Sequence, residues 1–500
     1  MSDNEILVVK INEVIGRVVA PDWEVLGGLY NKFAVFVEKA RWDKRYKAGT
    51  WDGKIHFVHK NGDFPIGLFQ EVVEWLKAQE DYVVSVDPKF KFQEVSKKDF
   101  SKDFMKVTEE TFMDTCPYIP REHQIRGAIK SLFYGRAICE HCTGSGKSLM
   151  IALVSNYIFQ KNPEGQILII VPTLDLIEQL TEDFIDYGVS PNLLGKFTGE
   201  QKDEDEPIII STWQSAYTQP RFLKQFDALL VDECHGLKAD CVRKVSEYAI
   251  NAKTRLGFTG SLPDEHTDVM LIKSTLGCVV DTVLHKDLEA IGQISKIKIS
   301  IPFLKYSKET TALLRKSTKK NVLADPKSAF NFESNFIQNL KERNRFIGKI
   351  CKKKIEADHN TLILANLHAH IDNIVAELKD LGIDPIVVTG KITDIEERNR
   401  LRKQLEEKGG QVLVATSKVF STGVSIKRLH CVIFAEAGKS KIKTLQSVGR
   451  GLRQHATKTK LHLIDIADDF KYGNKHLGIR MDYYARNDFE VEVKEVQLNA

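Results

Sequence analysis

Cysteine, membrane-length apolar runs and an excess of charge of one sign are all scarce in this sequence. Eight of its 500 residues are cysteine, and their spacing forms no disulfide framework, which is typical of proteins from a reducing compartment. No apolar run approaches the roughly 18 residues that a membrane helix needs. The polar residues 1–5 also differ from a signal peptide. We therefore expect a cytoplasmic protein without a membrane partner.

The net charge of +4 is too small to indicate a partner, but two local blocks are strongly basic. Residues 437–460 contain Lys and Arg and no acid, and residues 341–354 contain Glu342 as their sole acid. Such blocks suit a polyanion, and a solvated basic face is the alternative interpretation of each.

The motif that organises the chain is a glycine-rich loop at residues 142–148, which read Cys-Thr-Gly-Ser-Gly-Lys-Ser. The backbone N–H groups of such a loop and the N-terminus of the following helix bind phosphate oxygens. His141 stands where the usual pattern has its first glycine, so the motif alone is weaker than most. It predicts binding of ATP and Mg²⁺ through Thr143, Gly144, Ser145, Gly146, Lys147 and Ser148.

Two adjacent carboxylates, Asp232 and Glu233, follow directly after the apolar residues 229–231. At the end of a buried strand, Asp232 can hold Mg²⁺ opposite Ser148, while Glu233 can orient and deprotonate the attacking water. A solvated acidic pair is the alternative. The phosphate-binding loop makes the catalytic interpretation the stronger one.

A third motif, Gln-Ser-Val-Gly-Arg-Gly-Leu-Arg, occupies residues 446–453. On a helix, Arg450 and Arg453 point the same way, so closure of two domains would bring both onto the γ-phosphate as arginine fingers. Basic residues on a helix are otherwise a solvated face. The three motifs together predict catalytic roles for Lys147, Asp232, Glu233, Arg450 and Arg453.

Short apolar runs alternate with amphipathic segments from residue 111 to about 286, and the alternation restarts near residue 297. This pattern predicts two tandem parallel-sheet domains with helices on both faces. We expect domains at residues 1–112, 113–287 and 288–500. The expected strands are residues 167–171, 208–210, 229–231 and 256–258, then 362–364, 386–388, 412–414, 432–434 and 461–464, with a last strand at 489–493.

The first domain shows α+β patterning. Residues 54–60 and 63–66 flank Asn61-Gly62 and predict a hairpin, while residues 68–78 predict a helix and 93–102 the start of a connector. Cations interleave with aromatic rings ahead of the hairpin, a composition that suits nucleic acid. The alternative is that the rings are core. The residues predicted to contact DNA are Arg45, Lys47, Trp51 and Lys54.

These motifs resemble those of superfamily 2 nucleic-acid helicases over residues 119–465. The resemblance implies two RecA-like domains, here after a small α+β domain. The resemblance implies that His235, Thr259 and Ser261 couple hydrolysis to movement. Residues 259–261, however, read Thr-Gly-Ser where that family normally has Ser-Ala-Thr. It also implies adenine contacts by Arg121 and Gln124, strand contacts by Thr173, Thr212, Thr389, Gly390 and Thr416, and nucleotide contacts by Gly423 and Gln446.

Within that superfamily the chain is most similar to the phage UvsW-type recombination helicases. The segments that carry this similarity are residues 51–55, 64–68, 420–426 and 439–442. The similarity implies ATP-driven 3′ to 5′ unwinding, branch migration of Holliday junctions, fork regression and annealing on branched DNA, by a monomer.

Two alternatives stay open. The motor motifs grip a sugar-phosphate backbone without distinguishing ribose from deoxyribose, so an RNA or RNA–DNA hybrid remodelling helicase is the nearer alternative. The more distant one is a non-motor protein in which ATP switches a DNA-binding shape, against which Glu233 and the two arginines argue.

Overall fold

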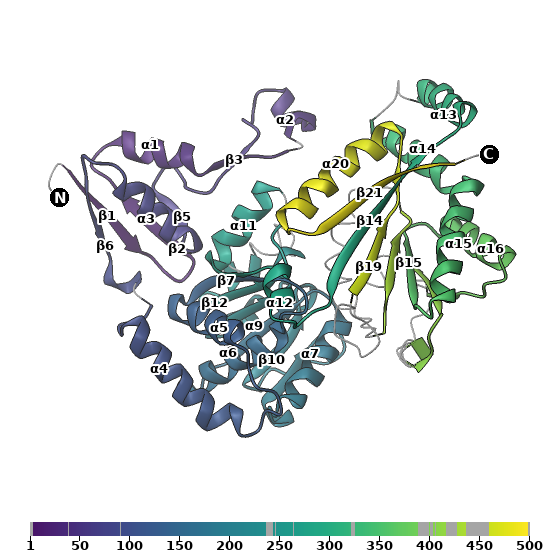
Figure 1. The fold of residues 1–500 in the computed structure, drawn as a ribbon. Helices are drawn as coiled ribbons and strands as arrows, with labels where there is room; N and C mark the ends of the chain where they lie inside the picture. Colours follow the sequence, from purple (N-terminus) through teal and green to yellow (C-terminus); the bar gives the residue numbers. More distant parts are fainter. Residues whose placement is uncertain are drawn as a thin grey trace. The chain divides into compact units, whose positions relative to one another are not determined.

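The computed structural model describes residues 4–38, 40–90, 92–236, 244–245, 247–263, 265–321, 326–388, 400, 404–405, 407–416, 428–436 and 460–498. Contacts divide the chain into two units, Met1–Val283 and Leu284–Ala500. Each unit contains one large parallel sheet with helices packed against it (Figure 1). The predicted α/β class with two tandem parallel-sheet domains is therefore confirmed.

A small α+β domain begins the first unit. Its four-stranded sheet has the order β5-β2-β1-β6, and helices α1 and α3 share a core with it that includes Val8, Leu29 and Leu76. The predicted helix at residues 68–78 is confirmed as α3. The elements are β1 (Glu5–Lys10), β2 (Ile15–Val19), α1 (Trp23–Lys32), β5 (Asp63–Pro65), α3 (Phe69–Lys77) and β6 (Val83–Val86).

The predicted hairpin around Asn61-Gly62 is wrong. Strand β4 (Lys54–His56) pairs with β3 (Ala34–Phe36), whereas β5 pairs with β2. A tight turn does form, since the His59 N–H donates to the Asp63 carbonyl over 2.8 Å. Phe57 and Val58, however, are 5% and 0% exposed. The turn therefore forms as the sequence indicates, but the flanking strands pair with β3 and β2 instead of with each other.

The predicted connector at residues 93–102 is also wrong in part, because helix α4 (Lys97–Thr108) begins there. Ser96 caps this helix: its hydroxyl donates to the Asp99 carboxylate and accepts from the Asp99 N–H. Phe100 and Phe104 then enter the core of the large sheet. The polar stretch is the exposed face of an amphipathic helix.

The large sheet of the first unit has seven strands in the order β13-β7-β12-β11-β8-β10-β9, all parallel. Both of its faces are covered: in β8, Ile167 and Ile169 belong to one buried cluster and Leu168 and Ile170 to another. The strands are β7 (Arg136–His141), β8 (Ile167–Val171), β9 (Leu194–Phe197), β10 (Ile208–Thr212), β11 (Ala228–Asp232), β12 (Thr254–Thr259) and β13 (Cys278–Val283).

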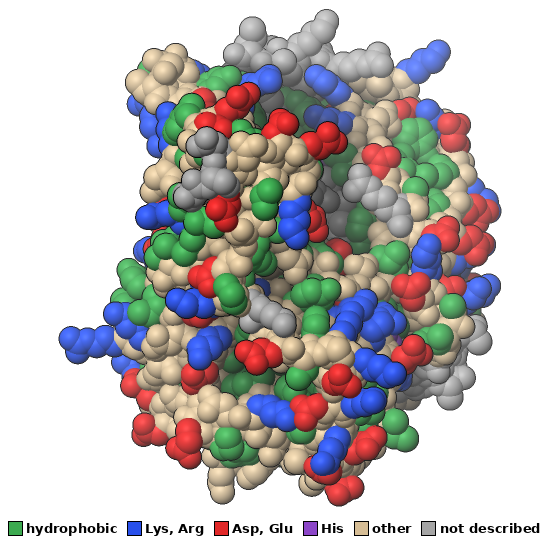
Figure 2. Space-filling view, turned by 90° about the vertical axis from the view of Figure 1, so that its left-hand side faces the viewer, with side chains coloured by type: hydrophobic (Ala, Val, Ile, Leu, Met, Phe, Trp, Pro, Cys, Tyr) green, Lys and Arg blue, Asp and Glu red, His purple; other side chains and the backbone are tan. Residues whose placement is uncertain are grey.

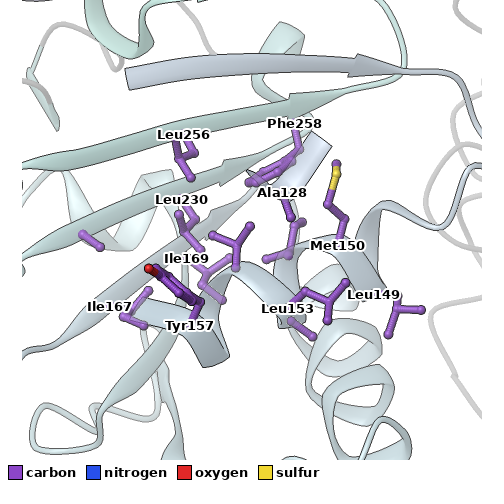
Figure 3. Close-up of a cluster of buried hydrophobic side chains, with 14 of the residues drawn as sticks. Ala128, Leu149, Met150, Leu153, Tyr157, Ile167, Ile169, Leu230, Leu256 and Phe258 are labelled. Atoms are coloured by element: carbon purple, nitrogen blue, oxygen red, sulfur yellow. The ribbon is translucent and has the colours of Figure 1, made fainter. Parts of the chain in front are cut away.

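Helix α6 (Lys147–Lys161) fastens the first of these clusters to the sheet. Figure 3 shows its Tyr157 close to Ile167 and Ile169, and its Met150 close to Ala128 and Phe258. A helix that follows the phosphate-binding loop is thus rigidly placed by the core beneath it. Further helices are α5 (Glu122–Tyr134), α7 (Leu174–Asp186), α8 (Trp213–Ala216), α9 (Pro220–Leu223) and α11 (His266–Leu276).

The small domain packs on α11. Met270 belongs to the small domain's core, and the Lys273 ammonium lies 2.6 Å from the Glu71 carboxylate. Gly67, in the short 3₁₀ turn Ile66–Leu68, lies so close to α11 that a Cβ there would collide with the backbone carbonyl oxygens of Lys273 and Ser274. The two parts of the first unit therefore pack as closely as a protein core.

The second unit contains an eight-stranded sheet with the order β16-β17-β15-β18-β19-β14-β20, and β21 pairs with β14. The predicted last strand is confirmed as β21. In the basic block, Arg343 is fully buried against Asp468. The strands are β14 (Lys296–Lys305), β15 (Thr361–Ala365), β16 (Ile386–Val388), β17 (Val412–Thr416), β18 (Cys431–Phe434), β19 (Lys460–Asp465), β20 (Ala467–Asp468) and β21 (Glu490–Gln497).

Helices cover this second sheet, and none of those in the described part of either unit is long and apolar enough to cross a membrane. The larger ones are α13 (Lys308–Asn321), α14 (Pro326–Gln338), α15 (Lys341–Glu356), α16 (His368–Asp380) and α20 (Lys471–Arg486).

Candidate functional site

The first-unit candidates lie at the carboxyl ends of neighbouring parallel strands, which is where open α/β sheets bind ligands. The phosphate-binding loop follows β7, Thr259 ends β12 and Asp232 ends β11. Since β7, β12 and β11 are adjacent in the sheet, the sheet brings these three segments to one edge.

The loop has the backbone that phosphate binding requires. Gly144 and Gly146 adopt φ angles of +90° and +81°, which L side chains rarely adopt. Helix α6 begins at Lys147, so its positive dipole end faces the loop. A Cβ at Gly146 would also collide with the side-chain nitrogen of Gln124.

Helix α5 holds the loop from one side. The Gln124 side-chain amide donates to the carbonyls of Ser145 and Gly146 over 3.1 and 3.0 Å and accepts from the Arg121 N–H over 2.8 Å. His123 Nε2 lies 2.9 Å from the Ser145 carbonyl, and burial lowers the pKa of His123. Gln124 thus braces the loop, while adenine contacts by Gln124 and Arg121 stay predictions.

One of the two carboxylates, that of Glu233, lies near the loop lysine. Lys147 Nζ lies 3.8 Å from Glu233 Oε1 and donates to the His141 carbonyl over 3.2 Å, while Asp232 accepts from the Glu233 N–H over 2.9 Å. Glu233 has a φ of +48°. Such a conformation costs about 1 to 3 kcal/mol and clusters at active sites.

The segment assigned to coupling is connected to these carboxylates. His235 Nδ1 lies 2.8 Å from Thr259 Oγ1 and 3.2 Å from Glu233 Oε2. Thr259 in turn donates to the Ser261 carbonyl over 2.8 Å. The histidine contacts Thr259, which bridges to the backbone of Ser261, so the structure brings together the three residues predicted to couple hydrolysis to movement.

The residues present fit a magnesium ion shared with phosphate oxygens. Ser148 and Asp232 offer a hydroxyl and a carboxylate, and Mg²⁺ binds one or two protein oxygens, with water and phosphate filling its other positions. Ser148 Oγ lies 2.9 Å from the Tyr187 hydroxyl. The Ser145 hydroxyl, inside the loop, is buried without a partner among the described residues. In that part of the chain no three His, Cys, Asp or Glu side chains form a protein-only metal cage.

The predicted strand contacts of the first unit lie farther along the same edge. Thr173 follows β8 and Thr212 ends β10, two adjacent strands. Thr212 caps helix α8 by accepting from the Ser215 N–H, whereas the Thr173 hydroxyl is buried and has no partner in the described ranges. Thr416 ends β17 of the second unit and is 8% exposed.

The basic and aromatic residues of the small domain surround the short helix α2 (Lys44–Lys47). The Arg45 guanidinium lies 4.9 Å from the Trp51 ring centroid, and Lys47 Nζ lies 5.6 Å from that of Trp42. Trp42 is 73% exposed, so this ring is not core. Lys54 is exposed on β4. Elsewhere, on the face shown in Figure 2, Lys and Arg alternate with Asp and Glu.

The comparisons with known proteins decide the family. Residues 16–87 match the N-terminal domain of the DNA helicase UvsW, 118–264 the res subunit of type III restriction enzymes, and 342–455 the conserved C-terminal domain of helicases. The ATP-dependent DNA helicase UvsW of Enterobacteria phage T4 is 30% identical over 490 residues, which are 93% of this chain and 94% of that protein. The chain belongs to the UvsW family. It is an ATP-dependent DNA helicase.

Solved structures agree with this family. The crystal structure of T4 UvsW has a TM-score of 0.51 at 28% identity, covering 99% of this chain and all of that one. A type ISP restriction-modification enzyme, LlaBIII bound to DNA, has a TM-score of 0.56 at 14% identity over 76% of this chain and 32% of that one, which shows the fold alone. A putative ATP-dependent helicase of Saccharomyces cerevisiae, IRC3, is 25% identical over 430 residues, 81% of this chain and 58% of that protein.

Part of the UvsW-type site lies outside the described residues. This part holds the two predicted arginine fingers, two predicted nucleotide contacts and two predicted strand contacts of the second domain. The residues concerned are Thr389, Gly390, Gly423, Gln446, Arg450 and Arg453.

Sequence reasoning missed two residues of this UvsW-family chain that contact the loop or the residue before it. Tyr187, after α7, meets Ser148, and Asp281, on β13, meets the ring of His141 over 2.8 Å. Neither lies in a motif, so the sequence carries no signal for either. Both contacts arise from the way the sheet folds.

Proposed function

We propose that this helicase is a Mg²⁺-dependent motor that acts on branched DNA. Its finer activities would be 3′ to 5′ unwinding, Holliday junction branch migration, fork regression and annealing, in phage recombination, repair and replication. Support comes from the match of residues 16–87 to a UvsW N-terminal domain. The motor would be a monomer with domains at residues 1–112, 113–287 and 288–500. RNA–DNA hybrids would be a further substrate.

The proposed chemistry is transfer of the γ-phosphate of ATP to water. The loop N–H groups and the Lys147 ammonium bind phosphate oxygens, and Glu233 takes a proton from the attacking water. Ser148 and Asp232 would hold Mg²⁺, which neutralises phosphate charge when bound. Lys147 already lies beside Glu233, at 3.8 Å, and this distance carries the assignment.

Coupling to movement is proposed to run along the edge of the first sheet. Glu233 contacts His235, which contacts Thr259, and Thr173 and Thr212 follow on the next strands. A change in bound nucleotide at one end of this edge would therefore reach a DNA strand at the other. Arg450 and Arg453 would complete the site from the second domain.

The small domain is proposed to recognise the branch. Its exposed Trp42 and the cations of α2 offer a ring for a base and charges for phosphates. In Figure 1, α2 lies at the end of the β3–β4 ribbon, away from the four-stranded sheet. Because that domain packs tightly on α11 through Glu71 and Lys273, α2 keeps a fixed position relative to the first motor sheet.

The test is the steady-state ATPase rate without nucleic acid and with single-stranded DNA, duplex, a four-way junction or matched RNA. Glu233→Gln serves as the blank. Stimulation that is largest on the junction and absent in the variant would support the proposal. Equal stimulation by RNA would favour a general remodeller, and no stimulation would leave an ATP-dependent switch.

A further inference from the structure

A cluster of charged side chains around the buried Asp281 lies beside His141, the residue that precedes the phosphate-binding loop. The Asp281 side chain, 3% exposed, accepts two hydrogen bonds from Arg126, over 2.9 and 3.1 Å, and one from Lys130 over 2.7 Å. His141 Nε2 lies 2.8 Å from its other oxygen. A carboxylate only accepts, so the His141 ring is the donor here.

An irregularity in the sheet places Asp281 there. Strand β13 pairs with β7, and the register shifts between Val279 and Asp281, which leaves Asp281 opposite Cys139. Alternate residues of a strand share a face, so Asp281 lies on the same face as Cys139 and His141. In a regular ladder Val280 would take this position. Bulges of this kind re-aim side chains beside active sites.

Strand β13 holds the residues at the start of the loop at two points. The Asp281 carboxylate fixes the His141 ring, and the Cys142 N–H donates to the Val283 carbonyl over 2.9 Å. Gly127 on α5 leaves room for the ring, because a Cβ there would lie 2.9 Å from His141 Cε1. Strand β13 thus fastens both the side chain and the backbone that precede the loop.

The position of His141 matters for catalysis because its carbonyl accepts a hydrogen bond from Lys147 Nζ over 3.2 Å. The position of this carbonyl therefore sets where the lysine ammonium rests. Burial alone would raise the pKa of Asp281, but hydrogen bonds from His141, Arg126 and Lys130 outweigh it and hold that pKa well below its usual range. The carboxylate is thus charged at neutral pH.

We propose that Asp281 is a positioning residue for ATP hydrolysis, which acts through the His141 ring to fix the start of the phosphate-binding loop and hence Lys147. The histidine in place of the usual first glycine is then a functional feature of this chain. The inference rests on the assignment of the loop as the ATP site. Strand β13 also runs directly into Leu284, where the second unit begins.

Three variants of the full-length protein test the role. Asp281→Asn keeps the shape and removes the charge, His141→Ala removes the ring, and His141→Gln keeps an N–H donor near Nε2. Asp281→Asn and His141→Ala should lower kcat about tenfold or more, with a smaller change in KM for ATP. Lys147 gains importance as charge builds on the phosphate in the transition state, which is why kcat is the more sensitive. His141→Gln should restore most of kcat.

The matched control is Asp468→Asn. Asp468 is 3% exposed and accepts two hydrogen bonds from Arg343, over 2.8 and 3.1 Å, far along the chain from the loop. This variant should lower the melting temperature and leave kcat unchanged. The double variant His141→Ala with Asp281→Asn should lose no more kcat than either single one, because both break one connection.

Retention of wild-type kcat by Asp281→Asn or His141→Ala would overturn the role, as would additive losses in the double variant. If Asp281→Asn does not fold, His141→Ala and His141→Gln decide, since both leave Arg126 and Lys130 paired. If the wild-type protein hydrolyses ATP no faster than Lys147→Ala, the assignment of the loop as the ATP site is itself wrong. That result is distinct from failure of the Asp281 role alone.

Discussion

Gly146 shows how much one absent Cβ matters at the residue scale. Its φ of +81° aims the loop backbone, and its missing side chain lets Gln124 reach the carbonyls of Ser145 and Gly146. The positive φ and the missing side chain are both required, because Gln124 occupies the space that a side chain at position 146 would take. Only glycine meets both.

Gly146→Ala should therefore weaken ATP binding about tenfold or more while the rest of the sheet stays folded. The added methyl must displace Gln124 and strain the backbone by about 1 to 2 kcal/mol. Equilibrium titration with a fluorescent ATP analogue measures the loss. The control is Gly199→Ala, where a Cβ meets nothing within 4 Å; ATP affinity equal to that of this control would contradict the prediction.

His370 is a buried histidine whose contribution to the stability of the folded chain depends on pH. Its ring is 1% exposed, and its Nε2 lies 3.2 Å from the Asn344 side-chain oxygen. Burial, with a smaller contribution from Arg343, lowers the pKa of His370 to about 3. The folded chain therefore keeps this ring neutral at pH 5, where the unfolded chain binds a proton.

Stability should consequently fall as the pH drops below about 6.5, the pKa of an unfolded histidine, and at pH 5 His370 alone should cost about 2 kcal/mol. His370→Gln removes this group, so its melting temperature should fall less between pH 7.5 and 5 than that of the wild type. The comparison is of the two pH-dependent shifts, since Gln also changes packing. Equal shifts would show that His370 is not the source.

At the scale of elements, Gly67 fixes the small domain on α11. Gly67→Ala would force its methyl against the Lys273 and Ser274 carbonyls, and overpacking of this kind costs about 1 to 3 kcal/mol. The ATPase rate without DNA should persist, whereas stimulation by a DNA junction should fall, because α2 would lose its fixed position. Unchanged stimulation would show that the rigid contact is not needed for DNA response.

Variants in and beside helix α2 should distinguish the contribution of charge to DNA binding from that of base stacking. Lys47→Ala should reduce the salt slope of DNA affinity by about one unit, whereas Trp42→Ala should weaken binding by about 1 to 3 kcal/mol at an unchanged slope. Binding is measured by fluorescence anisotropy at several salt concentrations. Lys60→Ala is the control, since Lys60 lies 5.4 Å from the Tyr30 ring centroid in the same domain. A slope change in that control equal to that of Lys47→Ala would refute the assignment.

Elements with a clear pattern of apolar residues were predictable from the sequence, whereas elements shaped by distant contacts were not. Strands β8 and β17 carry unbroken apolar runs, so the sequence predicts their place in a parallel sheet. The predicted β4–β5 hairpin is wrong although the turn at Gly62 forms, because β4 and β5 pair with the distant strands β3 and β2. Helix α4 was missed although Ser96 and Asp99 form a recognisable N-cap, because its polar face dominates the composition.

The candidate site divides in the same way. Lys147, Glu233 and His235 are found from motifs, because the chemistry predicted for each is one that few residue types allow. Asp281 is invisible to such reasoning, since a shift in strand register brings it to His141 across 140 positions in the chain. Contacts of this kind are properties of the folded sheet rather than of any local pattern.

At the scale of the whole molecule, ATP turnover should require both units. The first unit supplies Lys147 and Glu233, and Arg450, which lies outside the described residues, is predicted to supply the charge that stabilises the transition state. Arginine fingers are worth about 10³ to 10⁵ in kcat, so Arg450→Ala should nearly abolish turnover while ATP binding persists. Arg428→Ala is the control, because Arg428 is paired with Asp358 over 3.0 Å and should leave kcat unchanged. Turnover by Arg450→Ala within a few-fold of the wild type would mean that the first unit hydrolyses ATP without this arginine, and closure of the two domains would then not be tied to the chemical step.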